Sequence, residues 1–165
     1  YAYLNAGYSK DSIFPKVRAG AELYASLPKG FEASFGMRHL QFASKVNIYT
    51  GSLGLYAGNY WISLRPFITP GSPGTSFSGS VTLRRYLRDP YGYIGVQFGA
   101  GSAPDERYTT WEFFSLKSQR TELEIKKRIA PGLGFLASFG FVNQRINPGD
   151  YRKQYTFSTG LEKRF

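Results

Sequence analysis

Apolar and polar residues alternate with a period of two along most of the chain. Between residues 17 and 27, every second residue is Val, Ala or Leu, and the residues between them are Arg, Gly, Glu, Tyr and Ser. Only a β-strand places successive side chains on opposite faces with this period, and helical spacing does not fit. The alternation predicts ten strands, over residues 1–8, 17–27, 31–42, 46–56, 59–69, 76–88, 91–102, 111–129, 133–146 and 151–165.

Residues that break strands support these boundaries. The aspartates, and every proline except Pro66, fall between the predicted strands, where turns recruit them and strands exclude them. The connections after the first, fifth and seventh strands are long, whereas those after the second, fourth, sixth and eighth are tight turns such as "PKG" and "APG". The third and ninth connections are short exceptions. Long loops therefore gather at one end of the predicted sheet and tight turns at the other.

The polar face of this sheet is rich in ionised residues. It carries Arg18, Glu22, Glu32, Arg38, Arg65, Arg84, Arg120, Glu122, Glu124, Lys126, Arg128, Arg152, Glu162 and Arg164. In a soluble barrel or sandwich, the apolar face would be buried and these charges would be solvated outside. In a transmembrane barrel the faces are exchanged, so that Tyr, Phe and Leu contact lipid while Arg and Glu pair in a wet interior.

Three features favour the transmembrane interpretation. Strands of ~9–11 residues suit a tilted bilayer crossing, whereas soluble strands average ~5–6. Long loops at one end and tight turns at the other match extracellular loops and periplasmic turns. Aromatic girdles lie near strand ends, and the aromatic residues found there are Tyr60, Trp61, Tyr91, Tyr93, Tyr108, Trp111 and Tyr151. We therefore predict an all-β fold: an antiparallel up-and-down transmembrane β-barrel domain over residues 1–165, in the bacterial outer membrane, with about ten strands visible.

The last predicted strand carries an insertion signal. Phe157, Leu161 and Phe165 lie on one side of it, and Phe165 ends the chain. This arrangement resembles the C-terminal signal by which the barrel-insertion machinery recognises bacterial outer-membrane proteins. The last strand would then end in the periplasm, and the tight turns would lie on the same side.

Several stretches resemble the YaiO-type outer-membrane β-barrel family, over roughly residues 17–165. They are "VNIYTGSLGLYAGNYWISLRPF", "YLRDPYGYIGVQFGAGSAPDERYTTWEFFSLKSQR" and "APGLGFLASFGF", followed by the strand that ends in Phe. The resemblance implies upstream strands or a periplasmic helical-repeat region, so that the ten strands would be the C-terminal portion of a larger barrel. It also implies an architecture similar to that of barrels that export polysaccharide.

The interior charges leave two functions open. The net charge is +10, and the inward arginines outnumber the inward glutamates, so an open lumen would favour anions. The protein would then be a transport or export barrel for an anionic solute or polysaccharide. Alternatively, Arg–Glu pairs plug a narrow barrel that serves as a structural or interaction barrel with periplasmic or outer-membrane complex partners. Ten strands favour the plug, because a barrel of about eight is filled by side chains, and further strands would favour the pore.

Cations near the long-loop end form a second candidate surface. They are Lys10, Lys16, Lys45, Arg107, Lys117, Arg145 and Lys153. Lipopolysaccharide phosphates would lie at this level and suit Lys and Arg donors, although a solvated basic rim explains the cations equally well. Membrane lipids and lipopolysaccharide are therefore expected partners. Nucleic acid is not, despite a pI of about 9.8, because there is no clustered Lys/Arg helix and no RNP-like motif.

No catalytic residue, metal or cofactor is predicted. The chain has no cysteine, and His39 is its one histidine, which excludes a thiolate nucleophile and a Cys-based zinc site. By parity His39 faces lipid or headgroups, which favours its interpretation as an interfacial polar residue. A catalytic Asp–His pair with Asp105 or Asp150 is the weaker alternative. We therefore expect that the protein is not an enzyme.

Overall fold

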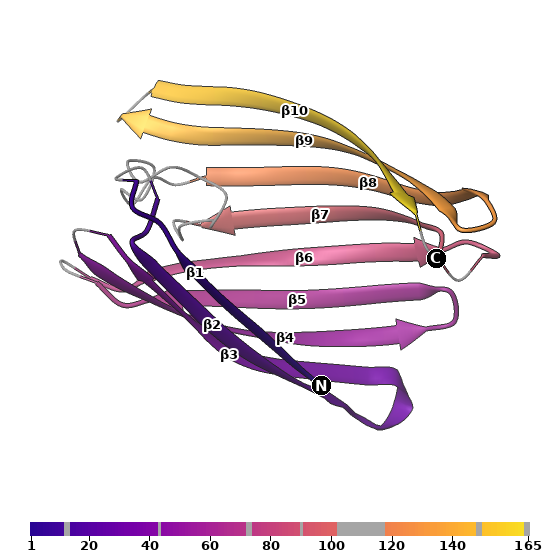
Figure 1. The fold of residues 1–165 in the computed structure, drawn as a ribbon, viewed down its shortest axis with the longest axis horizontal. Coiled ribbons are helices and arrows are strands. Elements are labelled where there is room, and N and C mark those ends of the chain that lie inside the picture. Colours follow the sequence, from indigo (N-terminus) through magenta and orange to yellow (C-terminus); the bar gives the residue numbers. More distant parts are fainter. Residues whose placement is uncertain are drawn as a thin grey trace.

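The predicted strands form one antiparallel sheet in the computed structural model, and each strand pairs with its neighbours in the chain (Figure 1). The structure describes residues 1–11, 14–42, 44–71, 74–89, 91–101, 118–147 and 150–163. The strands are β1 (Ala2–Tyr8), β2 (Val17–Ser26), β3 (Phe31–Gln41), β4 (Lys45–Ala57), β5 (Tyr60–Thr69), β6 (Ser76–Tyr86), β7 (Tyr93–Gly101), β8 (Ser118–Ala130), β9 (Leu133–Asn147) and β10 (Asp150–Lys163). The all-β, up-and-down antiparallel fold is therefore confirmed.

Tight turns and longer connections lie at opposite ends of the sheet (Figure 1). Residues 58–59 join β4 to β5, and a single 3-10 turn, Pro28–Gly30, lies between β2 and β3. Gly58 has a φ of 58°, a left-handed conformation that two-residue hairpins favour and that glycine adopts without steric cost. The difference between the two ends was predicted from the connection lengths. No helix within the described ranges is long and apolar enough to cross a bilayer.

The two faces of the sheet have opposite chemistry. On one face, large apolar side chains are exposed in every strand, and Leu64 and Phe157 illustrate this with exposed fractions of 55% and 73%. On the other face, Glu22 and Ser63 are only 5% and 6% exposed. A soluble protein shows the reverse distribution, whereas a barrel in lipid shows this one.

The sheet curls toward its charged face. The Arg65 Nη1 atom on β5 lies 2.6 Å from Glu22 Oε1 on β2, although these strands would be about 14 Å apart along a flat sheet at the usual spacing. The charged face is therefore concave, and Figure 1 shows β1, β2 and β3 crossing in front of the strands that follow. Within the described residues, β1 pairs with β2 alone and β10 with β9 alone. Closure into a cylinder stays a prediction.

The concave face also holds two apolar residues that the charge pattern did not predict. Leu40 on β3 and Ile48 on β4 are each 2% exposed. The register places Arg18 beside Leu40 and Arg38 beside Ile48. Arginine stems cover apolar surface while their charged ends reach water. This part of the interior is therefore drier than its charges suggest.

Pro66 is the proline that the sequence places inside a strand, and the β4–β5 ladder is interrupted there. The pairing of β5 with β6 runs continuously through Pro66 and Gly79. The pairing with β4 stops at Thr50–Phe67 and resumes at Leu53–Leu64. The Thr50 hydroxyl donates to the Pro66 carbonyl at 3.1 Å. A side chain therefore replaces part of the ladder where proline has no N–H.

Replacing Pro66 with Val should restore a ladder donor and raise the free energy of unfolding. Removing a proline also increases the entropy of the unfolded chain, which lowers stability. Pro70→Val is the control for that effect, because Pro70 follows β5. We expect Pro66→Val to be more stable than Pro70→Val by about 1 kcal/mol, the typical net value of one hydrogen bond. Urea unfolding in detergent measures the stability of both variants. Equal stabilities would contradict the explanation that the ladder is interrupted because Pro66 lacks an N–H donor.

Candidate functional site

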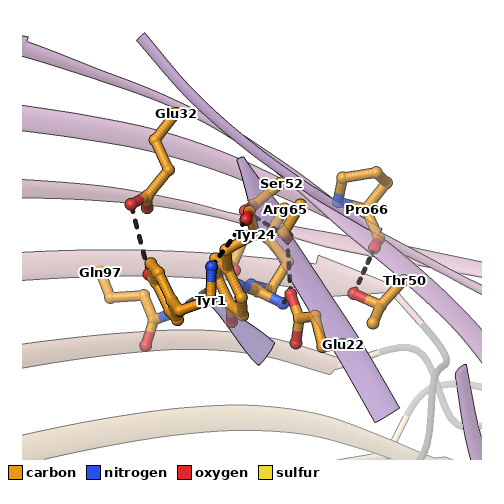
Figure 2. A network of polar contacts seen from close by, with 11 residues as sticks. Tyr1, Glu22, Tyr24, Glu32, Thr50, Ser52, Arg65, Pro66 and Gln97 are labelled. Atoms are coloured by element: carbon orange, nitrogen blue, oxygen red, sulfur yellow. Dashed lines mark hydrogen bonds and ion pairs between the residues drawn. The ribbon is translucent and has the colours of Figure 1, made fainter. Parts of the chain in front are cut away.

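Glu22 is the centre of a polar network on the concave face (Figure 2). Its Oε1 atom accepts a hydrogen bond from Ser34 Oγ at 2.6 Å and from Arg65 Nη1 at 2.6 Å. Arg65 Nη2 donates to the Tyr24 hydroxyl at 3.3 Å, and Ser34 Oγ lies 2.6 Å from Ser52 Oγ. A buried carboxylate requires such partners, because its desolvation is otherwise costly. The network thus ties β2, β3, β4 and β5 together across the curl.

An aromatic pair extends this network toward the turn end. The rings of Tyr1 and Tyr24 stack with centroids 4.5 Å apart and an interplanar angle of 7°. The Tyr1 hydroxyl donates to Glu32 Oε2 at 3.2 Å, as Figure 2 shows. The predicted inward position of Glu32 therefore lies beside the Glu22 network.

A second series of ion pairs runs over β6 to β10. Arg84 and Glu124 approach to 3.5 Å, Arg120 and Glu122 to 2.6 Å, and Lys126 and Glu162 to 2.5 Å. The pairs between β6 and β8, and between β8 and β10, each pass over an intervening strand. Ion pairs therefore join alternate strands along this half of the charged face as well.

Arg84 is the cation of this series that lies between two aromatic rings. Its guanidinium carbon lies 5.1 Å from the ring centroid of Trp61 and 4.6 Å from that of Tyr93. Gly95 lies opposite Arg84 on β7, and a Cβ atom there would come within 3.1 Å of Arg84 Cγ. Glycine thus leaves room for the arginine to lie along the wall between two rings. Such cation–π contacts hold the guanidinium in one orientation.

A hollow of about 300 Å³ opens on the concave face over β5 to β8. Arg65 and Arg84 line it from β5 and β6, and Glu122 and Glu124 line it from β8. The hollow is therefore lined by two cationic groups and two carboxylates, of which Arg84 and Glu124 are paired at 3.5 Å. No cluster of three His, Asp or Glu side chains that could hold a metal ion occurs among the described residues.

The strand register places the predicted inward residues on one face, as far as the structure describes them. They are Arg18, Glu22, Glu32, Arg38, Arg65, Arg84, Arg120, Glu122, Glu124, Arg128, Arg152 and Glu162. Arg164 lies outside the described residues. That this face lines a closed lumen stays a prediction.

Sequence reasoning missed part of this face. Asp89, in the turn after β6, pairs with Arg128 at 3.0 Å.

Trp61 and Tyr93 line the concave wall beside Arg84, so their assignment to an outer aromatic girdle is wrong. Tyr60 does face outward, and because successive strand residues point to opposite faces, Trp61 must face inward. Strict parity would have found this. Tyr108 and Trp111 lie outside the described residues.

The outer face holds the other predicted residues. Phe157 and Leu161 are 73% and 70% exposed on β10, and Phe165 lies outside the described residues. Recognition of this strand by the insertion machinery stays a prediction.

His39 also lies on the outer face, on β3. It is opposite Asn47 in the register, and its Nδ1 atom lies 2.7 Å from Asn47 Oδ1.

The cations of the long-loop end are only partly described. Lys45 begins β4 and Lys153 lies near the start of β10, and both are exposed. Arg107 and Lys117 lie outside the described residues. Binding of lipopolysaccharide at this end stays a prediction.

Comparison with known proteins identifies the family. A family model described as the YaiO membrane beta barrel domain matches residues 1–106. The match starts upstream of the resemblance noted in the sequence and ends before the "SLKSQR" stretch. No curated protein and no solved structure matches the chain significantly. The chain therefore belongs to the YaiO membrane β-barrel domain family, and it is a β-barrel protein of the bacterial outer membrane.

Proposed function

We propose that the barrel is a passage through the outer membrane for an anionic solute or polysaccharide, guided by the cations of its concave face. One observation carries this proposal: cations outnumber carboxylates on the face around which the sheet curls. The cations of the described ranges are Arg18, Arg38, Arg65, Arg84, Arg120, Lys126, Arg128 and Arg152, against Glu22, Glu32, Asp89, Glu122, Glu124 and Glu162.

The ion pairs strengthen the argument for anions. Glu22, Glu122, Glu124 and Glu162 each have a cationic partner within 4.0 Å, so their charges are largely compensated locally. The surplus positive charge then sets the field along the wall. A polar interior enclosed by low-dielectric walls focuses such a field and concentrates anions.

A plugged structural barrel is the second candidate. The Glu22–Arg65 pair favours it, because it crosses the concave space between β2 and β5 at 2.6 Å instead of lying along one strand pair. A cylinder of about ten strands has little interior space beyond its side chains. Such a barrel would serve an envelope complex through its loops or outer face.

Conductance measurements separate these two functions. We expect the full-length protein in planar bilayers to conduct with an anion preference, read from the reversal potential in a KCl gradient. Arg18→Gln combined with Arg38→Gln should lower the anion-to-cation permeability ratio at least about twofold, because two charges leave the wall. Arg85→Gln is the matched control, since Arg85 lies on the outer face over the Tyr60 ring. Absence of conductance in any salt would reject the passage.

The Glu22–Arg65 pair should also contribute to stability. Glu22→Gln leaves Arg65 without its carboxylate, and we expect a loss of about 1–3 kcal/mol in the free energy of unfolding. Glu162→Gln is the control, because that carboxylate is 42% exposed and exposed pairs contribute less than about 1 kcal/mol. Urea unfolding followed by circular dichroism measures both. If the pair is a plug, Glu22→Gln will also raise conductance.

We also propose that the protein is not an enzyme. His39 lies on the outer face with Asn47 as its hydrogen-bond partner, and Asp150 begins β10, which is not a neighbour of β3. We expect His39→Ala to leave hydrolysis of ester, peptide and glycosidic substrates at the background of the wild-type preparation. An activity that is present in the wild type and lost in His39→Ala would overturn this proposal.

A further inference from the structure

The hollow over β5 to β8 has the dimensions of a small ligand site. Its volume of about 300 Å³ lies at the lower end of the range of ~300–1,000 Å³ that is usual for ligand pockets. It opens on the concave side, so one unit of a longer chain could occupy it while the neighbouring units remain outside. Guidance of anions by the wall does not require such a hollow.

The charges around the hollow cancel. Arg65, Arg84, Glu122 and Glu124 all line it, and Arg84 lies 3.5 Å from Glu124, so the lining has no net charge. A net charge on a ligand would meet two groups of its own sign and two of the opposite sign, so the lining favours neither anions nor cations. A ligand without net charge can contact both kinds of group without the cost of removing an ion from water.

The charged groups are also held in place. Arg65 is fixed by Glu22 and Tyr24, and Glu122 by Arg120 at 2.6 Å. Arg84 lies between two aromatic rings. Because these side chains are already ordered, a ligand that binds to them does not bear the entropic cost of fixing them.

Four further lining residues are neutral and polar, and Trp61, Gly95 and Val96 complete the lining. The four polar residues are Ser63 on β5, Ser80 and Thr82 on β6, and Gln97 on β7. Each hydroxyl and the amide can both donate and accept hydrogen bonds, while the arginines only donate and the carboxylates only accept. Gln97 Nε2 already lies 3.4 Å from Ser80 Oγ. The wall therefore offers donors and acceptors side by side.

We propose that this hollow is a binding site for an uncharged sugar unit. The hydroxyl groups of a sugar are each a donor and an acceptor, and they match a rigid wall on which both kinds of group alternate. This site goes beyond the guidance of anions, because a sugar can bind to the wall of a sealed barrel as well as to that of an open one.

Binding measurements on the full-length protein in detergent test the site. A printed array of neutral and acidic oligosaccharides identifies the tightest binder, and isothermal titration calorimetry gives its affinity. We expect a neutral glycan to be selected. Gln97→Ala and Glu122→Gln should each weaken it about threefold to tenfold, the value of one hydrogen bond. Gln154→Ala is the matched control, since Gln154 also lies on the concave face of the sheet, but on β10 and outside the hollow.

The outcomes separate this site from the proposed passage. Binding of a neutral glycan, weakened by Gln97→Ala and unchanged by Gln154→Ala, supports the site whether or not the barrel conducts. Selection of acidic glycans alone, no binding on the array, or equal weakening by Gln97→Ala and Gln154→Ala would each overturn it. Glu122→Gln keeps the shape of the side chain, so its effect remains informative if Gln97→Ala reduces the yield of folded barrel, as judged by circular dichroism.

Discussion

Hydrocarbon offers no hydrogen-bond partner to a polypeptide backbone, and the structure of this protein is organised around that constraint. Each inner strand, from β2 to β9, pairs with both of its neighbours in one continuous antiparallel sheet, while β1 and β10 each pair with one. Because the ladder uses the backbone alone, the side chains are free to follow the two solvents, with apolar groups toward lipid and ionised groups toward the concave side. Pro66 is the position where this rule is relaxed, and the Thr50 hydroxyl there takes over part of the role of the ladder.

The concave face shows how ionised groups can be packed on the inside of a curved sheet. Long side chains reach over an intervening strand to a partner of opposite charge, as Glu22 and Arg65 do, and small residues such as Gly95 leave room for them to lie along the wall. The same contacts limit the free space in front of the wall. The proposed guidance of anions and the alternative obstruction of the interior would therefore both arise from one set of residues, and the width of the full barrel would decide between them.

The charges are not distributed evenly over this face. Cations outnumber carboxylates over the face as a whole, whereas the lining of the hollow has two arginines, Arg65 and Arg84, and two glutamates, Glu122 and Glu124. A surplus of positive charge suits an anion that moves along the wall, while the balanced lining of the hollow suits an uncharged sugar unit that rests on it. Both features belong to the concave face, and neither requires a catalytic group.

The strands, their order and the two faces follow from the sequence, because a period of two is a local property and antiparallel neighbours need only short connections. Parity also determined which arginines and glutamates share a face. It could not determine which of them meet: the pairs Glu22–Arg65 and Arg84–Glu124 depend on how strongly the sheet curls, and no local pattern encodes that curvature. The burial of Leu40 and Ile48 and the inward stacking of Trp61 on Arg84 likewise arise only when neighbouring strands are brought into register. The sequence alone thus determined the chemistry of each face, and the tertiary structure decided the partners, because contacts across the curl join residues that are distant in the chain.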